Sequence, residues 1–193
     1  TLSGEALREE IRRCVTVVAG SDTQLFINDY WQEAIAEGAY GVHLGQEDMD
    51  SADLAAIAAA GLRLGLSTHS VDELDRALSV HPSYVASGAI FPTTTKVLKS
   101  DPQGIERLRE YVRQAGETPV VAIGGLLTPE DVATTAACRP AAVCIVRGMG
   151  HNLAEMLTRR PALQRAWQHG HQSPRLPPTR LPHPCLPEHT RAN

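Results

Sequence analysis

Six short apolar runs alternate with helical segments over most of the chain, and this alternation constrains the fold more than any other feature. The runs are continuously apolar and do not alternate with polar residues, which is typical of strands buried on both faces. Repeated strand–helix units require parallel strands joined by right-handed crossovers. The pattern therefore predicts an α/β fold, either a closed βα barrel or a doubly wound sheet. The predicted strands are residues 24–28, 40–45, 62–67, 83–90, 119–125 and 141–146.

Polar, charged or glycine residues follow every one of these strands. An open sheet places its ligand at one crevice, served by two or three strand ends, whereas a barrel gathers the loops after all its strands around one mouth. Loops are polar in any protein, but that alone does not explain two acidic sites and a Thr-Thr-Thr-Lys turn. The strand ends therefore favour the barrel. A complete barrel has eight strands in about 200 residues or more, so six strands predict an incomplete one.

Length and composition limit the remaining possibilities. With 193 residues, 42% of them hydrophobic, the chain can form one globular domain with a core; we place this domain at residues 1–168. Residues 169–193 are rich in proline and predict a disordered or loosely attached tail, with a proline-rich docking ligand as the alternative. The net charge of −4 gives no reason to expect a nucleic-acid partner. No apolar run reaches the roughly 20 residues of a membrane helix, so no membrane association is expected.

The cysteine and histidine patterns indicate no metal cluster. The four cysteines show no CxxC pair and no zinc-ligand spacing, which favours reduced thiols in a cytoplasmic protein. His43 falls inside a predicted strand, where a packed and hydrogen-bonded imidazole is more common than a general base. His69 borders the expected mouth. Ser70 and Glu73 have the spacing of a helix capping box.

Asp29 and Asp48 follow two adjacent predicted strands. In a barrel both carboxylates would lie at the same mouth, where they could hold one hard cation; Mg²⁺ takes one or two carboxylates together with phosphate oxygens and waters. The alternative is that each aspartate caps the helix that follows it. The turn at 93–96 offers three hydroxyls and one ammonium, a combination that suits an anion better than an apolar neighbour.

The motifs LFINDYWQEAIAEGAYGVHLGQED, GLSTHS, SGAIFPTTTK and PVVAIGG occur in this one chain. Together they resemble the thiamine phosphate synthase family (thiamine monophosphate synthase and TenI-like proteins), and the resemblance runs from about residue 4 to residue 168. It implies a TIM (β/α)8-type barrel and a transferase reaction. In that reaction a hydroxymethylpyrimidine diphosphate is joined to thiazole phosphate, giving thiamine phosphate and diphosphate.

The resemblance also implies roles for particular residues. Mg²⁺ would be the cofactor, bound by Asp29 and Asp48. Asn28, Ser67 and Lys96 would contact the pyrimidine diphosphate, and Ser67 and Lys96 would be the catalytic residues. Lys96 would neutralise charge on the leaving diphosphate, so that a pyrimidine methyl cation forms and the thiazole nitrogen attacks it without a protein nucleophile. The residues implied for the thiazole phosphate are Thr93, Thr94, Thr95, Gly125, Val146 and Arg147.

The sequence departs from the family pattern in two respects. The family's first strand, first helix and second strand, with a Gln-x-Arg-x-Lys phosphate-binding stretch, do not occur in it. We therefore expect an N-terminally truncated barrel domain with little synthase activity of its own, or a homo-oligomer or complementing chain that fills the gap. Arg147 stands where the family usually has serine; it could clasp a phosphate or obstruct the pocket.

Two alternatives to a synthase follow from these departures. One is a thiazole tautomerase-like barrel, which handles thiazole phosphate without a diphosphate substrate. Asp29, Asp48 and Lys96 argue against it, because they would have no diphosphate to serve. The other is a catalytically inactive fragment that acts as a structural or interaction protein.

Overall fold

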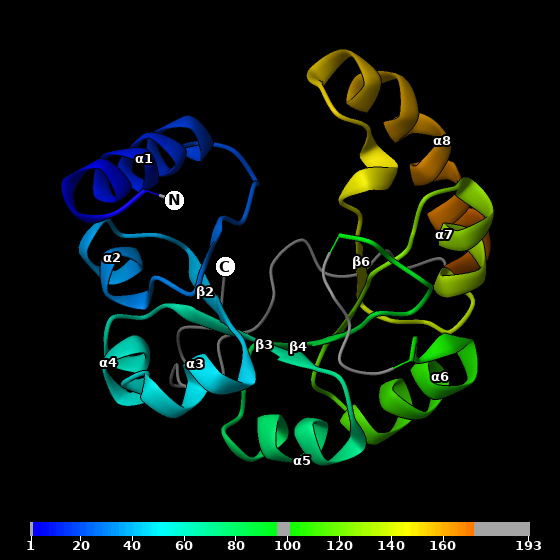
Figure 1. The fold of residues 1–193 in the computed structure, drawn as a ribbon, viewed down its shortest axis with the longest axis horizontal. Coiled ribbons are helices and arrows are strands. Elements are labelled where there is room, and N and C mark those ends of the chain that lie inside the picture. Colours follow the sequence, from blue (N-terminus) through cyan, green and yellow to red (C-terminus); the bar gives the residue numbers. More distant parts are fainter. Residues whose placement is uncertain (1, 96–100, 172–193) are drawn as a thin grey trace. The chain divides into compact units, whose positions relative to one another are not determined.

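The computed structural model describes residues 2–95 and 101–171, which form two compact units, each with parallel strands and flanking helices (Figure 1). Unit 1 consists of residues 2–67 and 79–84, and unit 2 of residues 68–78, 85–95 and 101–171. All six predicted strands are present: β1 Phe26–Asn28, β2 Gly41–Leu44, β3 Arg63–Thr68, β4 Tyr84–Ser87, β5 Val120–Ile123 and β6 Ala142–Cys144. The helices of the described residues are α1 Gly4–Val18, α2 Trp31–Ala36, α3 Gln46–Ser51, α4 Leu54–Ala59, α5 Val71–Ser79, α6 Gly104–Ala115, α7 Pro129–Ala136, α8 Leu153–His171 and the 3-10 helix η1 Arg147–Met149.

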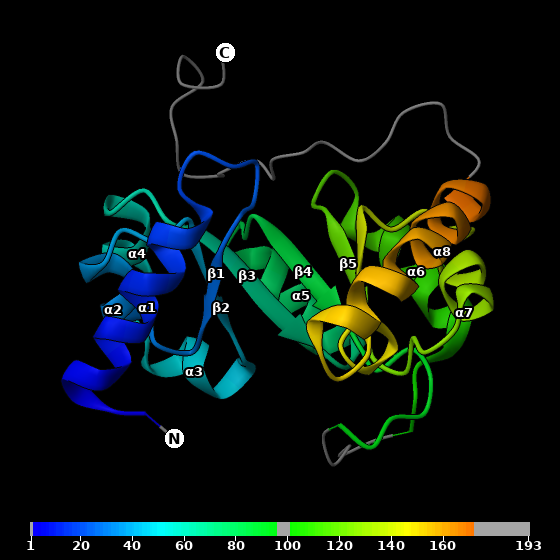
Figure 2. The same cartoon turned by 90° about the horizontal axis from the view of Figure 1, so that it is seen from above.

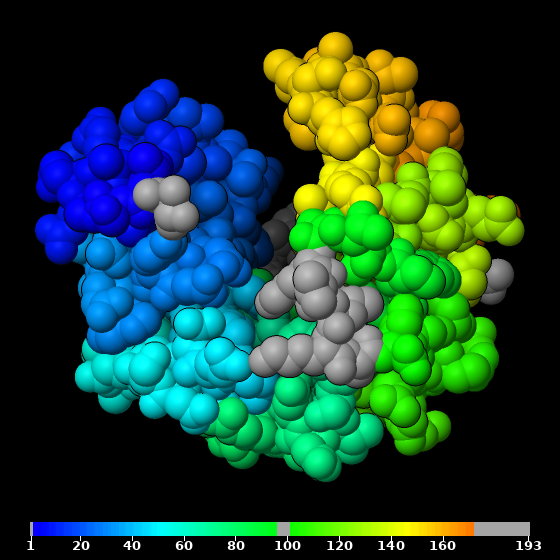
Figure 3. Space-filling model, in the orientation of Figure 1, coloured from blue at the N-terminus to red at the C-terminus, as the bar shows by residue number. Residues whose placement is uncertain are grey.

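Unit 1 is a parallel sheet of β1, β2 and β3 in chain order. Asn28 at the end of β1 is the register partner of His43 in β2, and Leu44 is the partner of Leu66 in β3. Side chains of the apolar runs form the core of this unit, and Leu44 and Leu66 have no accessible surface. In the space-filling view, the side chains of α1, α2 and α3 form a continuous outer surface on this unit (Figure 3).

Unit 2 repeats this arrangement with β4, β5 and β6, again parallel and in chain order. Helices α6, α7 and α8 lie beside these strands (Figure 2). Leu126, Val132 and Leu163 form a buried apolar cluster that joins the loop after β5 to α7 and α8. Helices α7 and α8 approach closely at Gly170, where a Cβ atom would overlap the backbone of Ala133.

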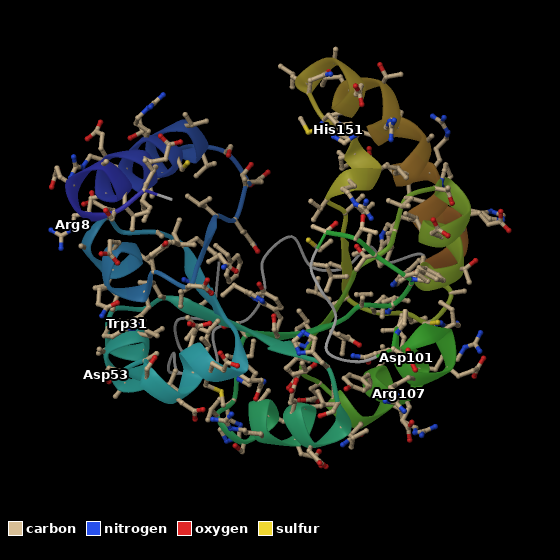
Figure 4. All side chains as sticks on the ribbon, viewed as in Figure 1. Arg8, Trp31, Asp53, Asp101, Arg107 and His151 are labelled. Carbon is tan, nitrogen blue, oxygen red and sulfur yellow. The ribbon has the colours of Figure 1, made fainter. Side chains whose placement is uncertain are left out.

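The two arginines labelled in Figure 4 lie on helices that flank the strands of their own units (Figure 4). Arg8 on α1 and Arg107 on α6 point away from the strands of their own units (Figure 4). Asp53, at the N-cap of α4, accepts a hydrogen bond from the backbone N–H of Ala56 at 2.9 Å. Within the described part of the chain, no helix combines the length and the apolar character needed to cross a membrane.

Two local details differ from the sequence predictions. Ser70 Oγ accepts a hydrogen bond from the backbone N–H of Glu73 as predicted, but the Glu73 carboxylate accepts from the N–H of His69 rather than from Ser70. Helix α8 continues to His171, three residues beyond the predicted domain boundary at 168, so the first residues assigned to the tail are helical. The rest of the tail, residues 172–193, lies outside the described residues.

Candidate active site

Asn28 and Asp29 occupy the carboxyl end of β1 in unit 1. The backbone N–H of Asp29 donates to the carbonyl of His43 at 2.9 Å, which extends the contact with β2 by one residue beyond the strand. Asp29 has a φ of 67°, in the left-handed region that few residues other than glycine adopt. The side chains of both residues are exposed. The carboxyl end of β1 therefore presents an amide and a carboxylate to solvent.

Asp48 lies near the carboxyl end of β2, in the first turn of α3. Its Oδ2 atom accepts a 3.3 Å hydrogen bond from the backbone N–H of Gly45, the N-cap residue of that helix. Asp48 thus makes a capping contact within its own helix, α3, without being the N-cap residue of that helix. The contact engages one carboxylate oxygen. The N-cap of α2, by contrast, is Tyr30 and not Asp29.

Ser67, near the end of β3, is held by a chain of side-chain hydrogen bonds. His43 Nε2 lies 2.8 Å from Ser67 Oγ, and His43 Nδ1 lies 2.7 Å from Tyr84 Oη. The imidazole and phenol rings also stack, with centroids 5.5 Å apart. Gln46 donates from its side-chain amide to the Ser67 carbonyl at 2.7 Å. His43 is therefore the packed, hydrogen-bonded imidazole that the sequence predicted, and it fixes the position of the Ser67 hydroxyl.

The sequence analysis missed three residues that shape these strand ends. Gln46 donates to the Ser67 carbonyl, and Tyr84 holds His43, which in turn contacts the Ser67 hydroxyl. In unit 2, the amide of Gln103 donates to the Gly88 carbonyl at 2.7 Å, at the end of β4. The available signals were weak: Gln46 directly follows a strand-ending glycine, and Gln103 stands alone between a proline and a glycine.

The carboxylates of Asp29 and Asp48 are ligands of the kind that Mg²⁺ binds in proteins. Asp29 and Asp48 follow neighbouring strands and supply hard oxygen donors. The described residues contain no group of three or more histidine, cysteine, aspartate or glutamate side chains that could hold a metal ion. Mg²⁺ is commonly bound by one or two carboxylates, with phosphate oxygens and waters completing its shell. The donor set therefore fits this ion.

In unit 2, the loops after β4, β5 and β6 lie against one another. The backbone N–H of Phe91 donates to the Gly124 carbonyl at 3.0 Å. Gly125 has a φ of +74°, and a Cβ atom there would lie 2.5 Å from the Phe91 carbonyl oxygen, so only glycine fits. Gly148, in η1, packs equally closely on the backbone of Leu126. Close backbone contact thus joins the three loops.

Arg147 connects the loop after β6 to the threonine turn. Its Nη1 atom donates to Thr94 Oγ1 at 2.6 Å, and its Nη2 atom donates to Thr93 Oγ1 at 3.4 Å. The backbone N–H of Thr95 donates to Thr93 Oγ1 at 3.2 Å. The structure therefore brings together most of the residues that the resemblance assigns to the thiazole phosphate. Val146, next to Arg147, has 55% of its surface exposed, and Lys96 lies outside the described residues.

The cysteines of unit 2 are not activated. Burial raises the pKa of the Cys144 thiol in β6, and burial also raises the pKa of Cys138. Both side chains are therefore neutral thiols near pH 7, and a thiol is a far weaker nucleophile than a thiolate.

The fold and these loops define a class of protein: a parallel α/β protein with polar and glycine-rich loops at the carboxyl ends of its strands, where such proteins bind phosphorylated ligands. Residues 1–149 match the family described as thiamine monophosphate synthase. The chain belongs to this family, and the resemblance seen in the sequence motifs is confirmed.

Individual relatives agree with this assignment. The chain is 77% identical over 125 residues to a thiamine-phosphate synthase of Neisseria meningitidis serogroup A, an alignment that covers 65% of this chain and 61% of the relative. It is 50% identical over 145 residues to the enzyme of Serratia proteamaculans, covering 75% of this chain and 68% of that protein. The chain thus spans about three fifths of the length of the Neisseria relative.

A solved structure supports the fold. A thiamine phosphate pyrophosphorylase from Pyrococcus furiosus superposes with a TM-score of 0.71, covering 88% of this chain and 80% of that structure at 24% identity. At this identity the likeness concerns the fold alone. The predicted α/β fold with six parallel strands is confirmed.

Proposed function

We propose that the protein is a thiamine phosphate synthase that joins a hydroxymethylpyrimidine diphosphate to thiazole phosphate and releases diphosphate. The observation that carries the proposal is the grouping of Asn28, Asp29, Asp48 and Ser67 at the carboxyl ends of three adjacent parallel strands in unit 1. The synthase names of its relatives favour this activity over a tautomerase. The free thiols of Cys14, Cys138 and Cys144 suit a reducing cytoplasmic location.

We assign the pyrimidine diphosphate to Asn28, Ser67 and Lys96, and Mg²⁺ to Asp29 and Asp48. When bound there, Mg²⁺ would supply positive charge to the diphosphate oxygens. Ser67 suits a positioning role because its hydroxyl is fixed by His43, which in turn is fixed by Tyr84. Lys96 would lower the free energy of the departing diphosphate by charge neutralisation.

We assign the thiazole phosphate to the loops of unit 2, where the residues are Thr93, Thr94, Thr95, Gly125, Val146 and Arg147. In the reaction, the C–O bond between the pyrimidine methylene and the diphosphate breaks, and diphosphate leaves with the electron pair. The thiazole nitrogen then donates its lone pair to the methylene cation and forms the new C–N bond. The atoms balance without a protein nucleophile.

The reaction itself provides the test. Purified protein is incubated with both substrates and Mg²⁺, and thiamine phosphate is measured after oxidation to its fluorescent thiochrome. We expect product that requires both substrates and Mg²⁺, at a rate that depends on how tightly each substrate binds. Calorimetric binding of each substrate is therefore measured in parallel. A protein that forms no product and binds neither substrate would contradict the proposal.

A further inference from the structure

The directions of the hydrogen bonds around Arg147 carry an inference beyond its assignment to the phosphate subsite. A guanidinium group is a donor only, with five N–H groups and no acceptor. In both of its contacts with the threonine turn, Arg147 must therefore donate, and the hydroxyl oxygens of Thr94 and Thr93 must accept. Because each hydroxyl oxygen accepts from the guanidinium, the hydrogen of that hydroxyl must point away from Arg147.

The hydroxyl of Thr94 has its hydrogen directed away from Arg147. Its oxygen accepts from Nη1 at 2.6 Å, a short bond typical of a charged donor. Among the described residues, no other hydrogen-bond partner of this hydroxyl is found. Since the side chain is exposed, the hydrogen of Thr94 is available to an acceptor from outside the protein.

The hydroxyl of Thr93 donates in turn to the hydroxyl of Thr95. Its oxygen accepts from Arg147 Nη2 and from the backbone N–H of Thr95, which occupies both lone pairs. Its own hydrogen therefore donates to Thr95 Oγ1, 3.2 Å away. The Thr95 hydroxyl, now an acceptor, is left with a hydrogen that points out of this network. The hydroxyls of Thr94 and Thr95 can therefore both donate to a ligand.

The Nε atom of Arg147 adds a third donor. It is buried and has no hydrogen-bond partner in the described part of the chain, and a buried donor without a partner is costly. Two outward hydroxyl hydrogens beside a positive charge are complementary to an anionic acceptor.

We propose that Arg147 is a specificity-determining residue that selects a phosphate dianion by orienting the hydroxyls of Thr93, Thr94 and Thr95 as donors. It acts partly through these hydroxyls, so its effect exceeds that of a nearby positive charge. A ligand with an alcohol in place of the phosphate gains less, because its one neutral oxygen is a weaker acceptor than a phosphate dianion. This inference rests on the proposed function, since the ligand used to test it is the thiazole phosphate.

The test measures, by calorimetry, the affinity for thiazole phosphate and for the same thiazole with a free hydroxyl. Arg147→Met keeps much of the side-chain volume and removes every donor. We expect it to weaken thiazole phosphate binding roughly 10- to 100-fold, the range for hydrogen bonds to charged groups, and to change binding of the alcohol less than about twofold. Arg147→Lys should restore only part of the loss, because an ammonium lacks the planar fork that reaches two hydroxyls.

A double-mutant cycle separates action through the hydroxyls from simple charge. Thr94→Val should weaken phosphate binding in the wild-type background, and clearly less when Arg147→Met is already present. Thr94→Ser, which keeps the hydroxyl, should bind as the wild type does. The matched control is Arg159→Met on α8, where a half-exposed arginine of equal charge contacts the Gly148 carbonyl at 3.4 Å and no threonine; it should have little effect.

The outcomes distinguish the two levels of the proposal. If the wild type binds no thiazole phosphate, the proposed function fails. If the wild type binds it and Arg147→Met binds equally well, or loses the alcohol to the same extent, the role of Arg147 is overturned. Equal costs of Thr94→Val in both backgrounds would overturn it too. Should Arg147→Met not fold, the Arg147→Lys, Thr94→Val and Thr94→Ser variants give the same decision.

Discussion

Replacing Gly65 by alanine should disrupt the support of Ser67 from within β3. Gly65 is the register partner of His43 in β2, and its φ is not in the left-handed region, so alanine meets no backbone strain. A Cβ atom at residue 65 would instead overlap the ring and hydroxyl of Tyr84. The absence of a side chain at Gly65 thus makes room for the phenol that binds His43.

The magnitude follows from what the phenol would lose. Tyr84 is only 9% exposed, it packs edge-on to Phe26 with ring centroids 5.1 Å apart, and its hydroxyl lies 2.7 Å from His43 Nδ1. Forcing a methyl group into a packed core costs about 1–3 kcal/mol, and losing the hydrogen bond costs about 0.5–1.5 kcal/mol. We therefore expect Gly65→Ala to lower the free energy of unfolding by roughly 2–4 kcal/mol and Tm by roughly 4–16 °C.

Urea denaturation and a thermal melt of the Gly65→Ala variant give the assay. Gly61→Ala is the control. Gly61 has a φ of +75° and nothing within 4 Å of an added Cβ, so this variant measures the cost of backbone strain in the absence of steric overlap. The Tyr84→Leu background removes the overlapping ring, and there Gly65→Ala should cost much less. A Gly65→Ala protein as stable as the wild type, or one with the same cost in both backgrounds, would refute the reasoning.

Two further predictions concern unit 2, and a third compares one cysteine from each unit. Burial raises the pKa of Tyr111 to about 12, above the unfolded value of about 10; its contribution to stability is therefore complete below pH 10 and falls between pH 10 and 12. Tyr111→Phe should abolish that fall in urea unfolding at pH 8 and 11, and should change stability little at pH 7, because the buried hydroxyl forms no well-aligned hydrogen bond within the described residues. Gly125→Ala should lower Tm and weaken thiazole phosphate binding, since residue 125 would need a left-handed conformation, costing about 1–2 kcal/mol, with its Cβ overlapping the carbonyl of Phe91; unchanged calorimetry would oppose this. Iodoacetamide at pH 7.5 should modify Cys14 faster than Cys144, because burial raises the pKa of Cys144; mass spectrometry of the modified peptides would reveal the reverse order if the argument is wrong.

The sequence was sufficient to locate the strands, because burial on both faces leaves a continuous apolar run. It was less able to set their ends. The run at 83–90 is small and apolar apart from two serines, yet β4 stops at Ser87. Beyond it the carbonyls of Ala89 and Ile90 accept from the backbone N–H groups of Gln103 and Gly104. Apolar character reports burial, whereas a strand boundary is set by hydrogen bonding.

The candidate site was predictable only in part, for a similar reason. The motif positions of Asp29, Asp48 and Ser67 follow from strand ends, which are local features. The contacts that fix Ser67 join residues 24 and 41 positions apart, and the bond from Arg147 to Thr94 spans 53 positions. Side-chain partners at such separations depend on tertiary packing, which one sequence does not encode in any readable pattern.

In the proposed site, Asp29 and Asp48 together bind the Mg²⁺ that accompanies the pyrimidine diphosphate. Calorimetric titration of this substrate, with and without Mg²⁺, into the wild type, Asp29→Asn and Asp48→Asn tests it most directly. Glu47→Gln is the matched control, because Glu47 is an exposed acid beside Asp48 on the same helix. We expect Mg²⁺-dependent binding that is lost in both aspartate variants and kept in Glu47→Gln. Binding in either aspartate variant that equals the wild type in Mg²⁺ would contradict it.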